Sequence, residues 1–405
     1  GFYVYIERDF RFLFFAMLVN FVLFGVSLTI IGATLPKIIG EFKWSYTATG
    51  VVLAAGSIGY FVSTFLSGIL LQRLGPKRVI VVGLTLQATG LALFAVYPLV
   101  LLNFLLNFLI GFGQGGTEVV VNFSVVRIER SGQSRLMNLM HAAFSIGGVV
   151  GPYAVIMLMN TNLGWQTIYR LMALLVLLMA GTFAMLPFSR LTAEAAAAGR
   201  ENKAKIIDLL KHPLLILSFL ILFVYVGSEL GVSSWVSEYY VRIFGVSASI
   251  GAFMVSVFWT GLLIGRLGVS WGYRGYRQDM VAFVLASVCT VALLFSVLMR
   301  GPWLAGIGFF LSGLGYSAIY PLIMALVGRY FKQGQGAAVG FAATGGGIGA
   351  LLPFIMAAIA DRSGIWQGFL FYIALNVIMV ALIYAAMWQT RAIQNGDNHN
   401  HDLSR

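Results

Sequence analysis

The chain has 405 residues, of which 60% are hydrophobic and only 10% are charged. A soluble domain carries about 25% charged residues, and a chain this apolar would leave too much hydrophobic surface in water. The composition therefore excludes a soluble globular protein. A net charge of +12 would suggest a nucleic-acid partner in a soluble protein. Here the cationic residues lie between apolar blocks, so we expect a lipid bilayer as partner and no nucleic acid.

Twelve apolar segments are each long enough to cross a bilayer as a helix, which takes about 20 residues. Helices are expected because lipid offers backbone groups no other hydrogen-bonding partner. The sequence therefore predicts an all-α membrane protein. The predicted spans are residues 12–36, 47–71, 79–96, 98–126, 136–159, 168–188, 213–240, 248–269, 280–299, 302–328, 335–359 and 366–389.

The Lys and Arg residues are distributed unequally on the two sides of these spans. Nineteen of the 26 lie on the side that holds the N-terminus, five lie on the other side, and Arg170 and Arg266 fall at or within spans. Cationic residues accumulate in cytoplasmic loops. We therefore predict a multi-pass protein of the plasma membrane, which in a bacterium is the inner membrane, with both termini in the cytoplasm.

The two halves of the chain repeat each other at an offset of about 202 residues. Gly59 answers to Gly261, for example, and Gly111 to Gly313. Duplicated halves with the same orientation are related by an axis along the membrane normal, with the substrate site between them. We predict an N-terminal six-helix bundle at residues 1–189, a helical cytoplasmic linker at 190–212, a C-terminal six-helix bundle at 213–390 and a polar cytoplasmic tail at 391–405, disordered beyond Gln394.

The loop after the second span reads GILLQRLGPKRVI and resembles the signature G-x-x-x-D-R-x-G-R-K of the major facilitator superfamily. The matching positions are Gly68, Arg73, Gly75, Lys77 and Arg78. The resemblance implies two six-helix bundles related by a pseudo-twofold axis and a charge network that latches them on the cytoplasmic side. Gln72 replaces the usual acid of that network, which puts the network in doubt but not the fold. Arg266, near the cytoplasmic end of the eighth span, is a second candidate for this latch, and the alternative is that its side chain extends to the lipid headgroups.

Four further segments resemble the fucose/glucose–proton symporter group of this superfamily. They are GFGQGGTEVVVNFSVV in the fourth span, LMNLMHAAFSIGGVVGP in the fifth, YVGSELGVSSWVSEYY in the seventh and FWTGLLIGR in the eighth. The resemblance implies proton-coupled uptake of a sugar by alternating access. It also links Glu118 with protonation and Asn122 with sugar contact. The first span departs from some members of the group because it lacks their acid.

Three side chains within the spans are candidates for proton coupling. Glu118 lies in the middle of the fourth span and Glu229 in the middle of the seventh. A charge at this depth is costly, so such residues face a cavity or a partner, and burial favours the neutral form of a carboxyl group. His141 is the third candidate, because histidine exchanges protons near neutral pH. The alternative for each is a purely structural hydrogen bond to a neighbouring helix.

Amide and aromatic side chains within the spans are candidates for substrate contact. Amides hydrogen-bond hydroxyl groups, and aromatic rings stack on sugar faces, although most aromatic residues in a bundle only fill space. The candidates are Asn122, Asn20, Gln114, Asn138, Trp235, Trp259 and Tyr320, with Tyr60 as a further aromatic.

The sequence leaves the class of transport open. We expect a monomeric proton-coupled symporter of a small polar solute, with an exporter of drugs or metabolites and a non-transporting sensor as alternatives. Sodium remains an alternative coupling ion. No enzymatic activity, cofactor or metal site is expected. The single cysteine, Cys289, lies in an apolar block, which excludes a disulfide framework and a cysteine-based metal site.

Overall fold

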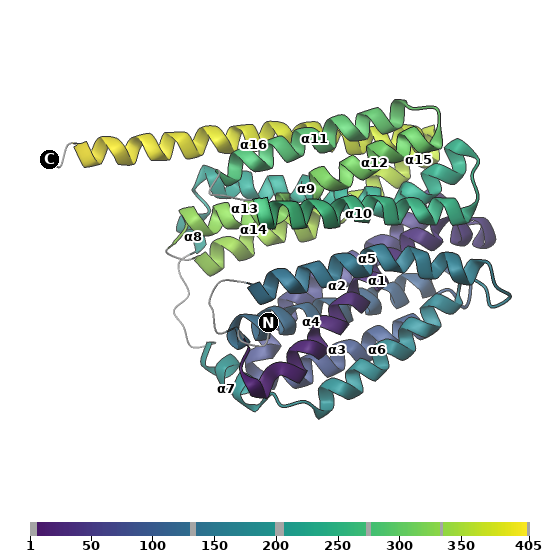
Figure 1. Ribbon diagram of the computed structural model, residues 1–405, viewed down its shortest axis with the longest axis horizontal. Coiled ribbons are helices and arrows are strands. Elements are labelled where there is room, and N and C mark those ends of the chain that lie inside the picture. The colour runs from purple at the N-terminus through teal and green to yellow at the C-terminus, as the bar shows by residue number, and fades with distance from the viewer. Residues whose placement is uncertain (1–5, 130–134, 199–205, 273–276, 333–334, 403–405) are drawn as a thin grey trace. The chain divides into compact units, whose positions relative to one another are not determined.

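The computed structural model of the protein describes residues 6–129, 135–198, 206–272, 277–332 and 335–402, which are almost entirely helical (Figure 1). The elements are η2 (Arg8–Phe10), α1 (Arg11–Phe42), α2 (Tyr46–Leu74), α3 (Pro76–Leu93), α4 (Val100–Ile128), α5 (Arg135–Met159), α6 (Thr167–Met185), α7 (Ser189–Ala198), α8 (Ile206–Leu209), α9 (Pro213–Phe244), α10 (Ala248–Gly272), α11 (Gln278–Leu298), α12 (Pro302–Tyr316), α13 (Ile319–Tyr330), α14 (Gln335–Gly349), α15 (Pro353–Ser363) and α16 (Ile365–Asp402).

The helices match the twelve predicted spans. Among the described residues, eleven helical segments are long and apolar enough to cross a membrane, counting α12 with α13 and α14 with α15. The third predicted span is α3, which is less apolar because it begins with Pro76, Lys77 and Arg78. It packs against α4 and α6. The predicted all-α fold of two six-helix bundles is confirmed, while the predicted bounds of the two bundles stay a prediction.

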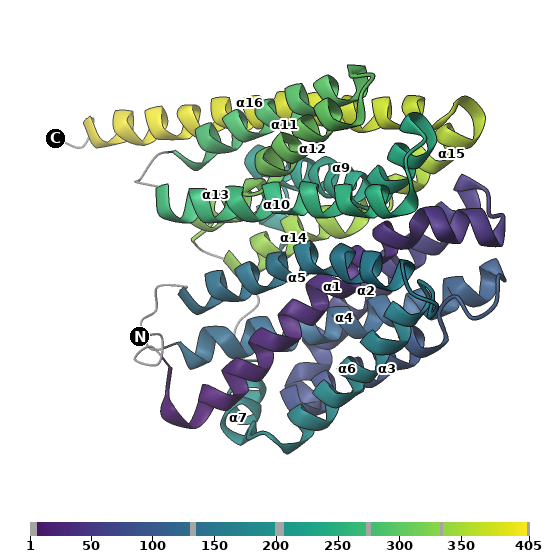
Figure 2. The ribbon, with the colours of Figure 1, turned by 45° about the vertical axis from the view of Figure 1, so that its right-hand side comes forward.

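Contacts divide the chain into two compact units. The first consists of Gly1–Glu201, Ser233–Trp259 and Ala357–Trp366, and the second of Asn202–Val232, Thr260–Met356 and Gln367–Arg405. In the first unit α2 packs on α4, α1 on α5 and α3 on α6, and in the second unit α11 packs along α12 (Figure 2). The first unit thus includes one end each of α9, α10 and α15, which belong to the second half of the sequence.

The same close helix contacts recur in both halves. A Cβ atom on Gly59 of α2 would lie 3.0 Å from the backbone nitrogen of Phe112 in α4. A Cβ atom on Gly261 of α10 would lie 3.0 Å from the backbone nitrogen of Leu314 in α12. Gly261 follows Gly59 by 202 residues, and Leu314 follows Phe112 by the same number. Small residues let membrane helices approach closely. The sequence repeat is therefore also a repeat of packing.

Pro36 and Pro321 each leave one backbone carbonyl group without its usual helical hydrogen bond. Pro36 lies inside α1, and Pro321 follows the break between α12 and α13. Proline has no N–H group, so it cannot bond the carbonyl group four residues earlier, which belongs to Gly32 in α1 and to Ser317 at the break. Side chains from other helices donate to these two carbonyl groups, as described below.

One prediction for the polar segments is wrong, and another agrees with the part of the linker that the structure describes. The predicted disorder beyond Gln394 is wrong, because α16 continues to Asp402 as one helix (Figure 1). Extension of an existing helix gains one hydrogen bond for each residue that is fixed, so the long span carries the polar residues with it. The predicted linker helix is present as α7 and α8, while residues 199–205 lie outside the described part of the chain.

Candidate functional site

The first polar cluster surrounds Glu118, which lies in the middle of α4. The Tyr60 hydroxyl group of α2 donates a hydrogen bond to the Glu118 carboxylate. Asn122, one helical turn further along α4, hydrogen-bonds the same carboxyl group. Tyr60 reaches Glu118 because α2 and α4 approach closely: a Cβ atom on Gly115 would lie 2.6 Å from the backbone oxygen of Tyr60. Three candidate residues from the sequence are thus brought into contact.

This first cluster combines a titratable group with an open hydrogen-bond acceptor. The side chains of the described residues that hydrogen-bond Glu118 are both neutral. Asn122 Oδ1 is buried and has no hydrogen-bond partner within the described part of the chain. A carboxyl group donates a hydrogen bond when protonated and only accepts when charged. The cluster can therefore bind a proton and hydrogen-bond the hydroxyl group of a ligand.

The second polar cluster surrounds Glu229 in α9. The Tyr225 hydroxyl group, one turn earlier on the same helix, hydrogen-bonds Glu229, and Arg266 of α10 attracts its carboxylate. The Arg266 Nε atom donates to the carbonyl oxygen of Ser317 at 3.1 Å. This is the carbonyl group that Pro321 leaves without its helical partner. The proline break therefore fixes the cation that compensates Glu229.

A network of neutral groups lies on the same stretch of α9. Ser228 Oγ and the Tyr316 hydroxyl oxygen lie within hydrogen-bond distance of Asn376 Oδ1 of α16, at 2.7 and 2.9 Å, and also of each other. Each hydroxyl group has one hydrogen, so the two hydrogens are shared among these three contacts. Sequence reasoning missed this network. Its clearest signal was Asn376, an amide inside the apolar run IALNVIMV.

The predicted aromatic contacts lie in different surroundings. Trp235 and Trp259 are buried in the first unit, and Trp259 Nε1 donates to Ser233 Oγ at 2.8 Å. Tyr320 lies beside the second cluster, since its ring centre is 6.3 Å from that of Tyr225. Tyr320 is thus the aromatic candidate that neighbours a buried carboxyl group of the second unit, and its contact with substrate stays a prediction.

The remaining polar candidates divide by burial. Asn20 of α1 and Gln114 of α4 are buried, and Asn20 Nδ2 has no hydrogen-bond partner among the described residues. Asn138 and His141 lie one turn apart on α5 and are exposed. The roles of all four residues stay predictions.

The predicted signature loop joins α2 to α3 and packs against α6 and α7. Gly75 has a φ of +81°, which favours glycine, and a Cβ atom there would lie 2.8 Å from Thr192 Cγ2 of α7. Lys77 Nζ donates to the carbonyl oxygen of Ala184 at 3.1 Å, in the last turn of α6, where a cation is favourable. The loop therefore connects four helices of the first unit. Its predicted role in a cytoplasmic latch stays a prediction, as does that of Arg266.

A third polar cluster was missed by the sequence reasoning. It consists of Tyr46, Glu238, Arg242 and Asp361, which come from α2, α9 and α15 and all belong to the first unit. Glu238 could have been noticed as an acid inside an apolar helix, but its connection to Tyr46 depends on tertiary structure. Within the described chain, no group of three His, Cys, Asp or Glu side chains could hold a metal ion.

The sequence is similar to known sequences over most of its length. Residues 17–352 match the sequence model of the Major Facilitator Superfamily. Similar curated proteins include "Protein TsgA homolog" from Serratia proteamaculans (strain 568) and from Yersinia pestis (strain Pestoides F). Each is 25% identical to this chain over 311 residues, which cover 76% of this chain and 77% of the relative.

Solved structures share the fold over nearly the whole chain. A mutant of the nucleoside transporter NupG has a TM-score of 0.76 at 16% identity, and the match covers 93% of this chain and 98% of that one. The transporter FucP in its outward conformation has a TM-score of 0.62 at 22% identity, and the match covers 94% and 99%. A second FucP structure, of a variant of the E. coli fucose:proton symporter, has the same TM-score and identity.

Proposed function

This chain belongs to the major facilitator superfamily, and we propose that it is a secondary transporter that takes up a small hydroxylated solute, such as a sugar, together with a proton. The observation that carries the proposal is the Glu118 cluster, in which a carboxyl group in the middle of an apolar helix hydrogen-bonds Tyr60 and Asn122. The proposal includes a monomer in the bacterial inner membrane, with both termini in the cytoplasm.

The chemistry of the cluster supports coupling between a proton and a solute. The neutral partners of Glu118 do not compensate a negative charge at bilayer depth, where an uncompensated charge is costly. A proton removes that cost, and the protonated carboxyl group then donates a hydrogen bond. A hydroxylated solute that accepts this bond binds better to the protonated state, so proton and solute stabilise each other's binding.

The proposed cycle is alternating access. A ligand shifts a conformational equilibrium only by the difference in its affinity for the two states. Binding of proton and solute together would favour the state that opens to the cytoplasm, and their release would allow the return. Glu229 is less suited to this exchange than Glu118, because the nearby positive charge of Arg266 attracts its carboxylate. The solute class is supported by the names of structural neighbours, a fucose:proton symporter and a nucleoside transporter, both of which concern sugar-containing molecules.

The test is transport in proteoliposomes that contain the purified full chain. We expect an inward proton gradient to drive accumulation of at least one of radiolabelled L-fucose, D-glucose and uridine, and an equal sodium gradient to have no effect. Accumulation that follows the sodium gradient would contradict proton coupling. Solute efflux driven by the inward proton gradient, with no uptake, would identify an exporter instead.

A further inference from the structure

The cluster of Tyr46, Glu238, Arg242 and Asp361 connects the first and second halves of the sequence within one compact unit. Tyr46 belongs to the first half, and the other three residues belong to the second half. The cluster lies where α2 begins, and α9 and α15 end there as well. By the order of the spans, this is the end of the bundle opposite the N-terminus.

The start of α2 depends on Asp361 for half of its hydrogen bonds. The first four N–H groups of a helix have no partner within the helix. The backbone N–H groups of Tyr46 and Thr47 donate to the two carboxylate oxygens of Asp361, at 2.9 and 2.6 Å. That of Ala48 donates to Ser45 Oγ at 3.0 Å, while Thr49 makes the first regular bond of the helix, to the Ser45 carbonyl oxygen at 3.0 Å. A second-half carboxylate therefore shares the cap of a first-half helix, where its charge is favourable.

The side chain of Tyr46 makes a second connection to the other half. Its hydroxyl group donates to Glu238 Oε1 at 2.9 Å, and Arg242 Nε donates to the same hydroxyl group at 3.3 Å. Arg242 Nη2 also lies 3.7 Å from Glu238 Oε1. The Glu238 side chain is 3% exposed and that of Arg242 is 64% exposed. The bond to Tyr46 therefore joins a buried carboxylate to the first half.

A third connection lies close to the first two. Ser237 of α9 donates to the Gly32 carbonyl group of α1, which Pro36 leaves without its helical partner. A Cβ atom on Gly32 would lie 2.7 Å from the backbone oxygen of Ser233. These contacts hold α1 directly against α9.

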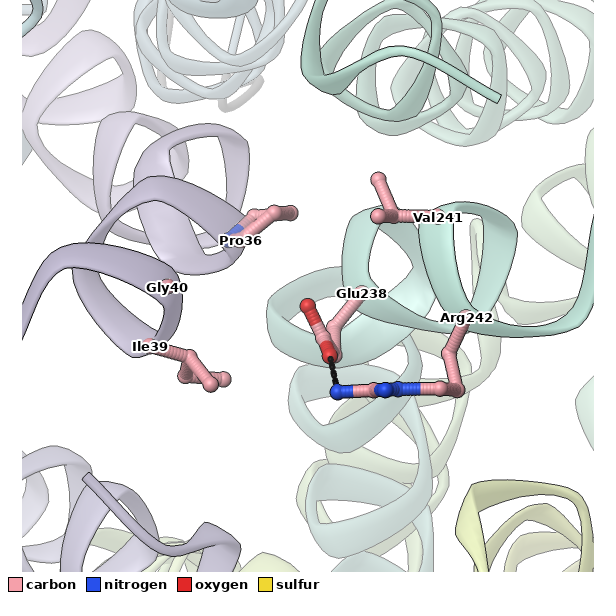
Figure 3. Close-up of a pocket in the computed structure, with 6 residues that line it drawn as sticks. All are labelled: Pro36, Ile39, Gly40, Glu238, Val241 and Arg242. Atoms are coloured by element: carbon pink, nitrogen blue, oxygen red, sulfur yellow. Dashed lines mark ion pairs between the residues drawn. The ribbon is translucent and has the colours of Figure 1, made fainter. Parts of the chain in front are cut away.

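Water can reach this region from two small cavities. One cavity of ≈ 250 Å³ is lined by Pro36, Ile39, Gly40, Glu238, Val241 and Arg242, and Figure 3 shows the first three on α1 facing the other three on α9. A second cavity of ≈ 350 Å³ includes Tyr46, Arg242 and Asp361 in its lining. The polar groups of the cluster are therefore within reach of water, which can take over their hydrogen bonds if these contacts break.

We propose that Glu238 and Asp361 are gating residues that hold the end of the bundle opposite the N-terminus closed. Glu238 and Asp361 accept hydrogen bonds from Tyr46 and Thr47, and each of these bonds joins a first-half helix to a second-half helix. These bonds must therefore break when this end opens. Their strength then sets how often the protein opens there. This proposal rests on the transport cycle of the proposed function, but not on its solute or its coupling ion.

The test is a distance measurement by electron paramagnetic resonance on the full chain in nanodiscs, without solute. Spin labels at Tyr97→Cys in the first half and Ile243→Cys in the second half use exposed positions outside the cluster. Cys289→Ala removes the single native cysteine, which is buried. We expect a short distance to dominate in the parent protein. Asp361→Asn and Glu238→Gln should each increase the long-distance population severalfold, and the double variant should increase it most.

The matched control is Glu41→Gln, which makes the same change at the same end of the bundle. Glu41 accepts a hydrogen bond from Trp165 Nε1 at 3.0 Å, and both residues lie in the first half. This variant should leave the distance distribution unchanged. A label pair at Tyr97→Cys and Leu163→Cys, within the first half, should report one unchanged distance in every folded variant.

Two results would overturn the proposal. One is an unchanged distribution in the double variant, and the other is an equal shift in Glu41→Gln. Tyr46→Phe provides a milder variant in case the charge changes impair folding, because it removes one hydroxyl group and keeps both Asp361 bonds. A failure of solute uptake would not affect these distances, so the gate and the proposed function are tested separately.

Discussion

Glu118 and Glu229 are both carboxyl groups in the middle of long apolar helices, one in each compact unit, but their surroundings differ. Neutral side chains of Tyr60 and Asn122 hydrogen-bond Glu118, whereas Arg266 lies near Glu229. A carboxylate beside a guanidinium group can stay charged throughout a cycle. A carboxylate with neutral partners has only a proton to compensate its charge. We therefore propose proton exchange at the first cluster and a charge interaction with Arg266 at the second.

Prolines contribute to this difference. Pro321 leaves the Ser317 carbonyl group free to accept from Arg266, which fixes the cation near Glu229. Pro36 leaves the Gly32 carbonyl group free to accept from the uncharged Ser237. A carbonyl group left without its helical bond thus holds the Arg266 cation in the second unit, and it joins α1 to α9 in the first unit. A proline in a membrane helix is therefore best interpreted together with the side chain that replaces its missing bond.

The largest effect is expected when the carboxyl group of the first cluster is neutralised. Glu118→Gln should reduce proton-driven accumulation to the level of protein-free liposomes, because Gln carries no titrating proton. Solute exchange without a gradient should continue, because Gln still binds the solute. Exchange of radiolabelled solute across liposomes provides the measurement. Asp9→Asn, at an exposed carboxyl group before the predicted first span, is the matched control and should behave as the parent. Full accumulation by Glu118→Gln would disprove its coupling role.

The second cluster should respond through stability. Arg266→Ala leaves the buried Glu229 charge without its cation, and we expect a loss of roughly 2 kcal/mol, less than for a fully buried pair because Arg266 is half-buried. Thermal unfolding in detergent measures this loss. Glu229→Gln combined with Arg266→Ala should recover stability, because neither charge remains. A double variant as unstable as Arg266→Ala alone would contradict the ion pair.

The repeated glycine contacts should respond alike in both units. Gly59→Ala and Gly261→Ala each place a methyl group 3.0 Å from a backbone nitrogen of the adjacent helix. We expect each to destabilise the protein by roughly 1 kcal/mol or more, since inserted methyl groups force backbone shifts. The control is Gly68→Ala, whose Cβ atom meets open space. A loss in only one half would show that the repeated contacts are not energetically equivalent.

A smaller effect on transport than that of Glu118→Gln is expected from the hydroxyl group beside Glu118. Tyr60→Phe removes one hydrogen bond to a carboxylate, worth about 1.5 kcal/mol, so proton-driven uptake at neutral pH should fall by up to about tenfold without being abolished. Initial uptake rates test this. Tyr225→Phe, the matched change beside Glu229, should have less effect on coupling. An equal or larger loss of coupling in Tyr225→Phe would remove the distinction between the two clusters.

The sequence predicted the fold well because lipid restricts the possible structures. Apolar length alone located the spans, and the repeat at Gly59 and Gly261 proved to be a repeat of packing. The contact of Glu118 with Asn122 was also predictable, since both lie one turn apart on the same helix. Contacts between distant spans were not predictable. The bonds of Tyr46 to Asp361 and Glu238, and that of Arg266 to Ser317, depend on how helices rotate and where prolines break them.

Proton entry with the solute is the most direct test of the central claim, that Glu118 exchanges the coupled proton. Proteoliposomes that enclose a pH-sensitive dye and contain the full chain receive L-fucose, D-glucose or uridine from outside, with no gradient imposed. We expect a transported solute to acidify the interior, Glu118→Gln to abolish the acidification, and folded Glu229→Gln to retain it. Solute entry without acidification, or acidification that persists in Glu118→Gln, would contradict proton exchange at Glu118.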